Sequence, residues 1–254
     1  RAFDAHALGQ LTLEVGAYRK LQSRARINDA AKALLLAYAQ GSDLDQLAAN
    51  VNLSRLVVQA EDLTAVPPVA AVLEEDDALR ERVQLVYEGL TTAGPRNSYI
   101  LHARNASGLV ADATAESPSP AVVHVTVLAL DGTGSASAEL LATVAAYLND
   151  DDVRPVADRV VVQSAEILPY QINAKLYMAS TGPESEGVLE QCKARLAAWI
   201  NPRRRLGVEV ARSAVDAQLH IDGVGRVELT GWADIRPSKS QAAWCTGFTV
   251  GRGE

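Results

Sequence analysis

Apolar residues recur at helical spacing through the amino-terminal part of the chain, and no proline interrupts residues 8–40. A first apolar stripe consists of Leu8, Leu11, Val15 and Tyr18, and a second, after a change of phase, consists of Ile27, Ala31, Leu34 and Tyr38. The spacing predicts one long helix or two stacked helices. A continuous helix of this length would extend about 50 Å, beyond the diameter of about 30 Å of a small domain. Because such a helix needs partners along its length, we expect a helical arm.

A second, shorter helix is predicted directly after this arm. Gly41 suits the position that follows a helix end, and Ser42 or Asp43 can cap the next helix. The apolar face of that helix would contain Leu44, Leu47 and Ala48. Residues 56–58 then lead into a segment with two adjacent prolines, 67–68, which we interpret as a linker.

The acidic run 74–77 stands immediately before a further helical pattern, which contains Leu79 and Val83. At the amino end of a helix the dipole favours negative charge. Calcium binding is a less favoured explanation, because the ligand spacing of a known calcium loop is absent. We therefore expect these acids to serve the helix end.

The central part of the chain alternates between strand and helix patterns. A strand is predicted at 122–130, a helix at 136–148 after a glycine-containing turn, and a valine-rich strand at 159–162. The order predicts a βαβ unit. The glycines of the turn, Gly132 and Gly134, lack the third glycine of a dinucleotide-binding loop, so we interpret them as a turn.

The last part of the chain repeats the alternation. Apolar residues at 172, 174, 176 and 178 alternate with polar ones, which predicts a half-buried strand. Further elements are predicted as a helix at 184–200 with Val188, Cys192, Leu196 and Trp199 on one face, a short helix at 213–219, and strands at 226–230 and 244–250. Helices on one face of a sheet are expected.

These elements predict a mixed α+β fold with three parts. They are a helical arm at 1–65, a middle α/β domain at 75–168 and a carboxyl-terminal α/β domain at 169–254.

Composition narrows the class of protein. Apolar residues make up 48% of 254 residues, so a substantial core is expected, and no apolar run approaches the length that crosses a membrane. The formal net charge is −7, with an acidic middle and mildly basic ends, which disfavours nucleic acid as a partner. Cys192 and Cys245 lie on different predicted elements, which favours buried free thiols over a disulfide.

No catalytic or metal-binding motif is present. The four histidines occur singly, and none stands at metal-ligand spacing with another histidine or a cysteine. We therefore predict no catalytic residue, no metal site and no cofactor. The run Arg203, Arg204 and Arg205 follows a predicted helix end, where it can complement helix carbonyls or pair with acids of a neighbouring subunit.

A series of motifs in fixed order resembles one known family. The passage 150–178 reads as acidic turn, Val-Arg-Pro, valine strand, Pro-Tyr and alternating strand. Other matching pieces lie at 30–39, 41–48, 102–113, 117–120, 203–207, 212–214, 219–220, 223–224, 226–229 and 243–246. In order and spacing over most of the chain, these pieces resemble the baseplate J-like family of contractile phage tails and tail-like bacteriocins. Members usually carry additional residues before the point where this chain opens.

The resemblance implies a structural wedge subunit of a baseplate and not an enzyme. Two copies would join one copy of a second wedge protein through a bundle of helical arms, while carboxyl-terminal domains pair with neighbouring wedges around the tube. Sheath, hub or tube proteins would be further partners, with assembly in the bacterial cytoplasm and release in the particle. The interface residues expected from the residues and the resemblance are Leu8, Leu11, Val15, Tyr18, Leu34, Tyr38, Arg203, Arg204 and Arg205.

Two other classes stay open. A cell-wall hydrolase would need converging acids with a raised pKa, and the acids here are scattered. A receptor- or glycan-binding module usually shows aromatic-rich strands, and aromatic residues make up only 5% of this chain.

Overall fold

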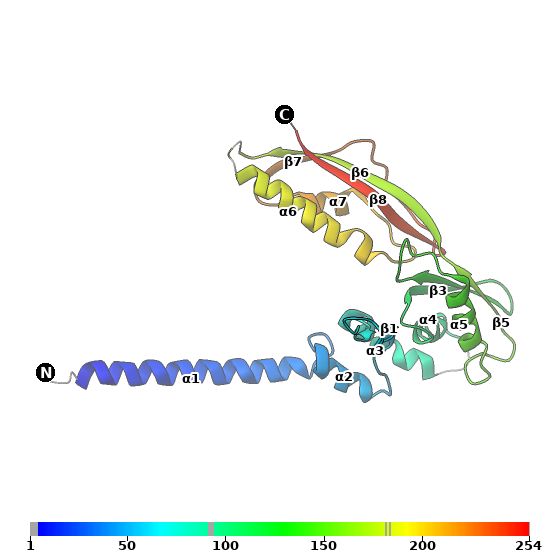
Figure 1. Cartoon of the computed structure of the whole chain (residues 1–254), viewed down its shortest axis with the longest axis horizontal. Helices are drawn as coiled ribbons and strands as arrows, with labels where there is room; N and C mark the ends of the chain where they lie inside the picture. The colour runs from blue at the N-terminus through cyan, green and yellow to red at the C-terminus, as the bar shows by residue number, and fades with distance from the viewer. Residues whose placement is uncertain (1–4, 91–93, 181, 183, 254) are drawn as a thin grey trace.

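The computed structural model describes residues 5–90, 94–180, 182 and 184–253, without the side chains of residues 5–12, 90 and 203. Its helices are α1 (Ala5–Ala33), α2 (Gly41–Ala49), α3 (Asp76–Leu85), α4 (Arg96–Asn105), α5 (Ala138–Leu148), α6 (Glu184–Trp199) and α7 (Arg212–Leu219). Its strands are β1 (Val57–Gln59), β2 (Val72–Leu73), β3 (Val110–Ser119), β4 (Val122–Ala129), β5 (Arg159–Ser164), β6 (Glu166–Met178), β7 (Val224–Leu229) and β8 (Gln241–Arg252). The predicted mixed α+β fold is confirmed. Figure 1 shows α1 extending away from the body that the other elements form.

The long helix is a single one, but it ends earlier than the sequence pattern suggests. Helix α1 stops at Ala33 and a turn follows, so Gly41 is not the residue after its end. Gly41 instead begins α2 with a φ of 51°, a left-handed conformation that glycine adopts without steric cost. The turn allows Ala39 to be buried together with Leu44 of α2 and Leu79 of α3.

The predicted cap of α2 is also wrong. The cap residue is Gln40, which makes no side-chain capping bond, and the Gly41 N–H donates to the Asp76 carboxylate at 3.0 Å. Asp76 of α3 therefore accepts a hydrogen bond at the start of α2, the role predicted for Ser42 or Asp43. The predicted apolar face of α2 is confirmed, since Leu44 and Ala48 are fully buried and Leu47 packs beside them.

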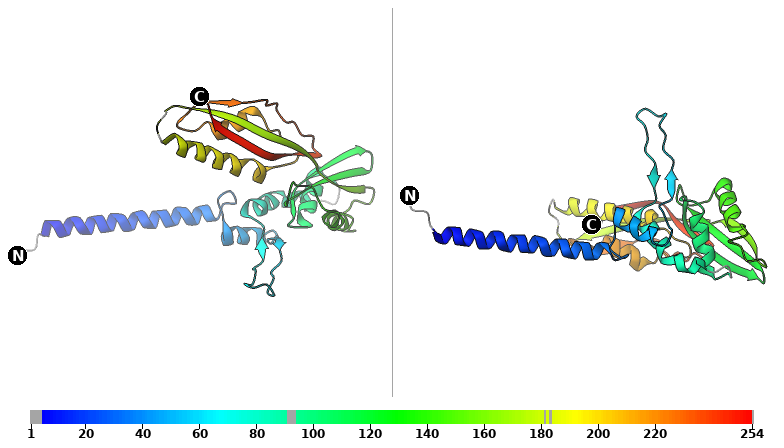
Figure 2. Two further views of the ribbon diagram at one scale, coloured as in Figure 1. Left: turned by 45° about the horizontal axis from the view of Figure 1, so that its top comes forward. Right: turned by 90° about the horizontal axis from the view of Figure 1, so that it is seen from below.

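The segment interpreted as a linker forms a β-hairpin. Strands β1 and β2 pair antiparallel, and farther out Asp62 and Val69 exchange two backbone hydrogen bonds of 2.9 Å. Figure 2 shows this hairpin standing out from the rest of the chain. The adjacent prolines, 67–68, lie in the tip of this hairpin and do not mark a linker.

The acidic run lies at the start of α3, as predicted, but its side chains bind arginines. Glu75 is the cap residue and makes no side-chain capping bond. Asp76 binds Arg55 at 2.5 Å and Asp77 binds Arg80 at 2.5 Å. Asp76 therefore joins α3 to the segment before the hairpin, whereas Asp77 pairs within α3. Both acids lie where the helix dipole favours negative charge.

The middle part contains the predicted βαβ unit and one further strand. Strands β4 and β5 pair in parallel, connected through α5, whose cap Ser137 accepts from the Leu140 N–H at 3.2 Å. The additional strand is β3, which pairs antiparallel with β4. Prolines near its carboxyl end explain why the sequence pattern does not indicate it. The core of the middle part contains the fully buried Val125, Val127 and Val144.

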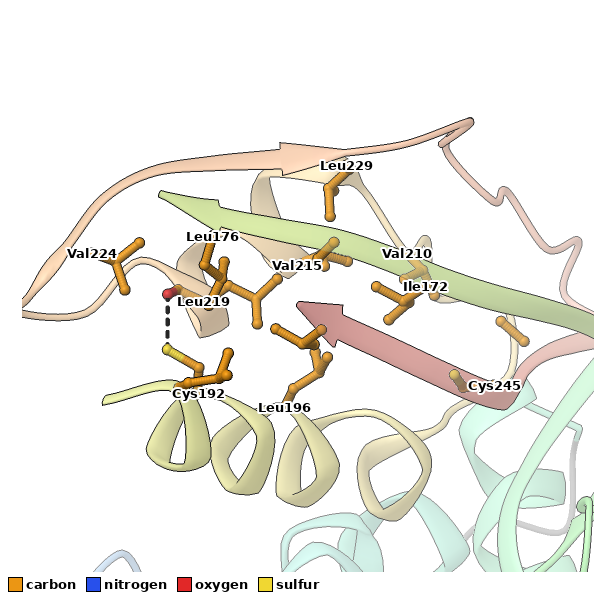
Figure 3. Packing of buried hydrophobic residues seen from close by; sticks show 14 residues of the cluster. Ile172, Leu176, Cys192, Leu196, Val210, Val215, Leu219, Val224, Leu229 and Cys245 are labelled. Atoms are coloured by element: carbon orange, nitrogen blue, oxygen red, sulfur yellow. Dashed lines mark hydrogen bonds between the residues drawn. The ribbon is translucent and has the colours of Figure 1, made fainter. Parts of the chain in front are cut away.

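The carboxyl-terminal part is a three-stranded sheet with the order β7-β6-β8, in which β6 is antiparallel to β7 and parallel to β8. Helices α6 and α7 cover one face, as predicted, and Figure 3 shows their apolar residues packed against the sheet. The alternation of β6 is confirmed, because Ile172, Ala174 and Leu176 are buried while their polar neighbours are exposed. Cys192 and Cys245 are free and buried, also as predicted.

Candidate functional site

The surface of α1 is the first candidate for function. Every described side chain from Leu13 to Lys32 is exposed, so no other described part of the chain covers the helix. Val15 is 44% exposed and Tyr18 62%. Leu8 and Leu11, the other members of the first apolar stripe, lie outside the described side chains. The helix therefore presents apolar side chains to solvent from Leu13 onwards. Figure 1 shows its backbone standing free of the other elements.

The turn after α1 adds further exposed apolar side chains, including Leu34 at 76% and Tyr38 at 61%. The turn itself is bound to α3. Arg80 of α3 donates to the carbonyl oxygens of Leu36 at 2.9 Å and Ala39 at 2.8 Å. The arginine therefore holds the segment between α1 and α2 and leaves the side chains from Leu13 to Lys32 exposed.

Arg55 is the central residue of the module that carries the arm. Its guanidinium binds Asp45 of α2 at 2.6 Å, Asp76 of α3 at 2.5 Å and the carbonyl oxygen of Glu74 at 2.8 Å. The Gly41 N–H and then Arg55 lower the pKa of the Asp76 carboxyl. The cluster joins α2, α3 and the root of the hairpin.

A buried ion pair supports the same module. Arg82 and Glu74 bind each other with side chains that are each 5% exposed. Arg82 also donates to the Asn105 side chain at 2.8 Å and to the Ser54 carbonyl at 3.1 Å. These hydrogen bonds compensate for the cost of burying the two charges.

The run of arginines makes contacts within the chain where its side chains are described. Arg204 donates to the carbonyl oxygens of Leu130 at 2.6 Å and Ala129 at 3.2 Å, and its guanidinium lies 5.0 Å from the ring centroid of Trp244. Arg205 binds Glu81 of α3 at 3.0 Å. The Arg203 side chain lies outside the described part. Both described arginines therefore join the carboxyl-terminal part to the preceding modules.

A cavity of about 730 Å³ lies at this junction, between the root of the hairpin, α3 and the arginines. On one side Glu81 binds both Arg104 at 2.7 Å and Arg205. Nearby, burial raises the pKa of the Asp112 carboxyl, although the Leu206 N–H, which donates to it at 2.9 Å, opposes the shift.

The junction does not have the features of an active site. The two oxygens of Asp112 accept from the Ala113 and Leu206 N–H groups, so this carboxyl holds a loop in place.

Burial raises the pKa of both cysteine thiols, which disfavours the reactive thiolate. Among the described residues, no three His, Cys, Asp or Glu side chains gather as metal ligands would. No helix of the described part is long and apolar enough to cross a membrane.

The sequence pattern does not predict the hairpin or the arginine clusters around Arg55 and Glu81. The motif Asp62-Leu63-Thr64 offers a signal for the hairpin, because an Asp side chain that binds the backbone two residues later is typical of a turn. Arg55 binds Asp76 from 21 residues away, and Glu81 binds Arg205 from 124 residues away. Arg80 binds the carbonyl oxygens of Leu36 and Ala39 from 44 and 41 residues away. No local pattern indicates these contacts.

Comparisons with known proteins agree with this architecture. The family model of the baseplate J-like N-terminal domain matches residues 10–62, and that of the baseplate J-like central domain matches residues 91–164. Baseplate protein J of Escherichia phage P2 is 48% identical over 239 residues, which cover 94% of this chain and 79% of the relative. The chain belongs to the baseplate J-like family and is a structural component of a baseplate.

Proposed function

We propose that the chain is a wedge subunit of the baseplate of a contractile tail or tail-like bacteriocin. Two copies join one copy of a second wedge protein through a helical bundle that contains α1. The carboxyl-terminal modules meet those of neighbouring wedges, and the resulting ring surrounds the tube and contacts sheath and hub proteins. Assembly takes place in the bacterial cytoplasm, before the particle is released.

The observation that carries this proposal is the isolation of α1. The helix has 29 residues, and its described side chains from Leu13 to Lys32 lie in solvent. Isolated helices gain little stability from propensity alone, and most helices in proteins are stabilised by packing of an apolar face. Burying the first apolar stripe in a bundle supplies that packing, at roughly 1.5–3 kcal/mol for each large side chain.

The ring would transmit fibre engagement to sheath contraction by a change of interfaces. Packed interfaces change between discrete arrangements and do not deform continuously. Arg80 binds the turn after α1 to α3, which gives a movement of the arm a route to α3.

The test is recovery of the wedge complex with a full chain that carries Val15→Asp and Tyr18→Asp. We expect near-stoichiometric recovery of a second wedge protein with the tagged wild-type chain from producing cells, identified by mass spectrometry, and at least a tenfold loss with the variant. Val156→Asp is the matched control, because Val156 is fully exposed and lies far from α1 in the sequence. Equal recovery with both variants would exclude α1 from the bundle.

A further inference from the structure

The β-hairpin carries an unusual number of exposed apolar side chains for so small an element. Leu63 is 71% exposed and Val66 98% exposed, both near the tip. Val57, Val69, Val72 and Leu73 are also exposed. Exposed apolar side chains that gather on one projecting element make that element a candidate interaction site.

The tip of the hairpin is well ordered by its own hydrogen bonds. One carboxylate oxygen of Asp62 accepts from the Thr64 N–H at 2.9 Å, the Thr64 hydroxyl at 2.6 Å and the Ala65 N–H at 3.2 Å. Asp62 and Val69 close the turn through their backbone. The exposed side chains are therefore presented on a defined loop, which lowers the entropy lost on binding.

The hairpin is acidic as well as apolar. Glu61 and Asp62 lie beside the tip, and no lysine or arginine occurs between Arg55 and Arg80. A partner surface that matches the hairpin would combine apolar side chains with positive charge.

One face of α1 has this combination. At 100° per residue, Leu13, Lys20, Arg24, Ile27 and Ala31 lie on one side of the helix, roughly opposite the first apolar stripe. We call these five residues the basic face. The rest of the helix surface carries Arg19, Arg26 and Lys32 together with the acids Glu14 and Asp29, so the basic face is distinguished by positive charge with no acid beside it. A bundle that buries the first stripe leaves the basic face available.

We propose that the hairpin of one copy docks on the basic face of α1 of a second copy, with Leu63 and Val66 against the apolar residues and Glu61 beside Lys20 or Arg24. The two surfaces have similar lengths. The basic face from Leu13 to Ile27 spans about 21 Å, and an extended segment from Val57 to Leu63 spans about 20 Å. The hairpin does not cover the basic face of its own chain, since every residue of that face is exposed. The proposed contact is therefore between two copies.

This docking rests on the proposed function in one respect, which is that two copies meet in a wedge. It adds a second contact between them, so each hairpin would hold the neighbouring arm at a set position. Two linked contacts raise the overall affinity beyond that of either alone.

Photocrosslinking from the hairpin tests the proposal. The full chain with p-benzoylphenylalanine in place of Val66 carries one affinity tag and a wild-type copy carries another, and wedges are isolated from producing cells before irradiation. We expect crosslinked species that contain both tags, with peptides from residues 13–32 of the wild-type copy. A crosslink to another protein or to another region overturns the docking. The same crosslinker at Tyr18 is the positive control, and its success with no product from position 66 also overturns it.

Charge exchange gives a second measure. Lys20→Glu and Glu61→Lys should each lower the crosslink yield about threefold, the effect of one exposed ion pair, and the double variant should restore it. Lys32→Glu makes the same change of charge 120° around the helix and past the carboxyl end of the first apolar stripe, and it should leave the yield unaltered. If Val15→Asp with Tyr18→Asp abolishes wedge recovery while the hairpin crosslinks elsewhere, the wedge proposal holds and the docking fails. If wedge recovery is insensitive to those substitutions, α1 is excluded from the bundle. The wedge proposal itself fails if no second wedge protein is recovered with the wild-type chain.

Discussion

Glu81 and Arg205 lie 3.0 Å apart across the junction between α3 and the carboxyl-terminal part of the chain. The same carboxylate binds Arg104 of α4 at 2.7 Å, so one acid connects three parts of the molecule. Arg104 is only 7% exposed at its side chain, whereas Arg205 is 35% exposed. The buried arginine therefore depends more strongly on Glu81 than the exposed one.

The first prediction concerns this acid. Glu81→Gln removes the negative charge from both arginines and leaves Arg104 buried without an ionic partner, so we expect a loss of about 1–3 kcal/mol in the free energy of unfolding. Urea denaturation of the full chain measures it. Arg236→Gln breaks a pair with Glu209 in which Arg236 is 75% exposed, and it should cost less than about 0.5 kcal/mol. Equal losses in the two variants would contradict a special role for Glu81.

A second prediction separates the two explanations of the arginine run. Arg204 and Arg205 have their described partners inside the chain, so replacing both with glutamate places acids opposite Glu81 and the Leu130 carbonyl. We expect the melting temperature to fall, by roughly 5–10 °C. Differential scanning calorimetry and wedge recovery are measured on the same preparation. A stable variant that no longer recovers its partners would instead support a subunit interface at these residues.

The sequence predicts those elements of the fold whose determinants are local. Strand β6 shows a strict alternation because one of its faces is covered by α6 and α7, so Ile172 and Leu176 could be identified as buried in advance. The end of α1 could not be predicted in the same way. Helical spacing continues through Leu34 and Tyr38, and the chain turns only because Ala39 packs with Leu79, which lies forty residues farther on.

The residues expected at a subunit interface show the same limit. Exposed apolar positions such as Val15 and Tyr18 follow from helical periodicity, and the structure places both in solvent. Periodicity alone does not distinguish a stripe that meets its own core from one that awaits a partner. For Arg204, the choice between neighbouring subunit and own chain depends on Leu130 and Trp244, whose positions are set by the tertiary fold.

A third prediction follows from the pKa of Asp76. The Gly41 N–H and Arg55 lower the pKa of this carboxyl in the folded chain. Its contribution to stability is therefore complete above the unfolded pKa of about 3.9 and is lost as the pH falls through the lower folded pKa. The difference in melting temperature between wild type and Asp76→Asn should be largest near neutral pH and shrink towards pH 3. Asp151→Asn, which makes the same replacement in an exposed turn, is the control. A difference that does not vary with pH would show that the carboxylate charge has no part in holding α2.

The last prediction compares two deletions that differ in where they cut. Removing residues 1–33 takes away α1, whose side chains from Leu13 to Lys32 are all exposed, so we expect the melting temperature to change by less than about 2 °C. Removing residues 1–65 also takes away Leu44, Ala48 and Arg55, which uncovers Leu79 and Val83 and leaves Asp76 without its cation. Uncovering two large apolar side chains costs about 3–6 kcal/mol, enough to lower the melting temperature by roughly 10 °C or more. Both deletions should abolish wedge recovery, but only the longer one should do so by damaging the fold. Equal melting temperatures would mean that α2 belongs with the arm and adds nothing to the stability of α3.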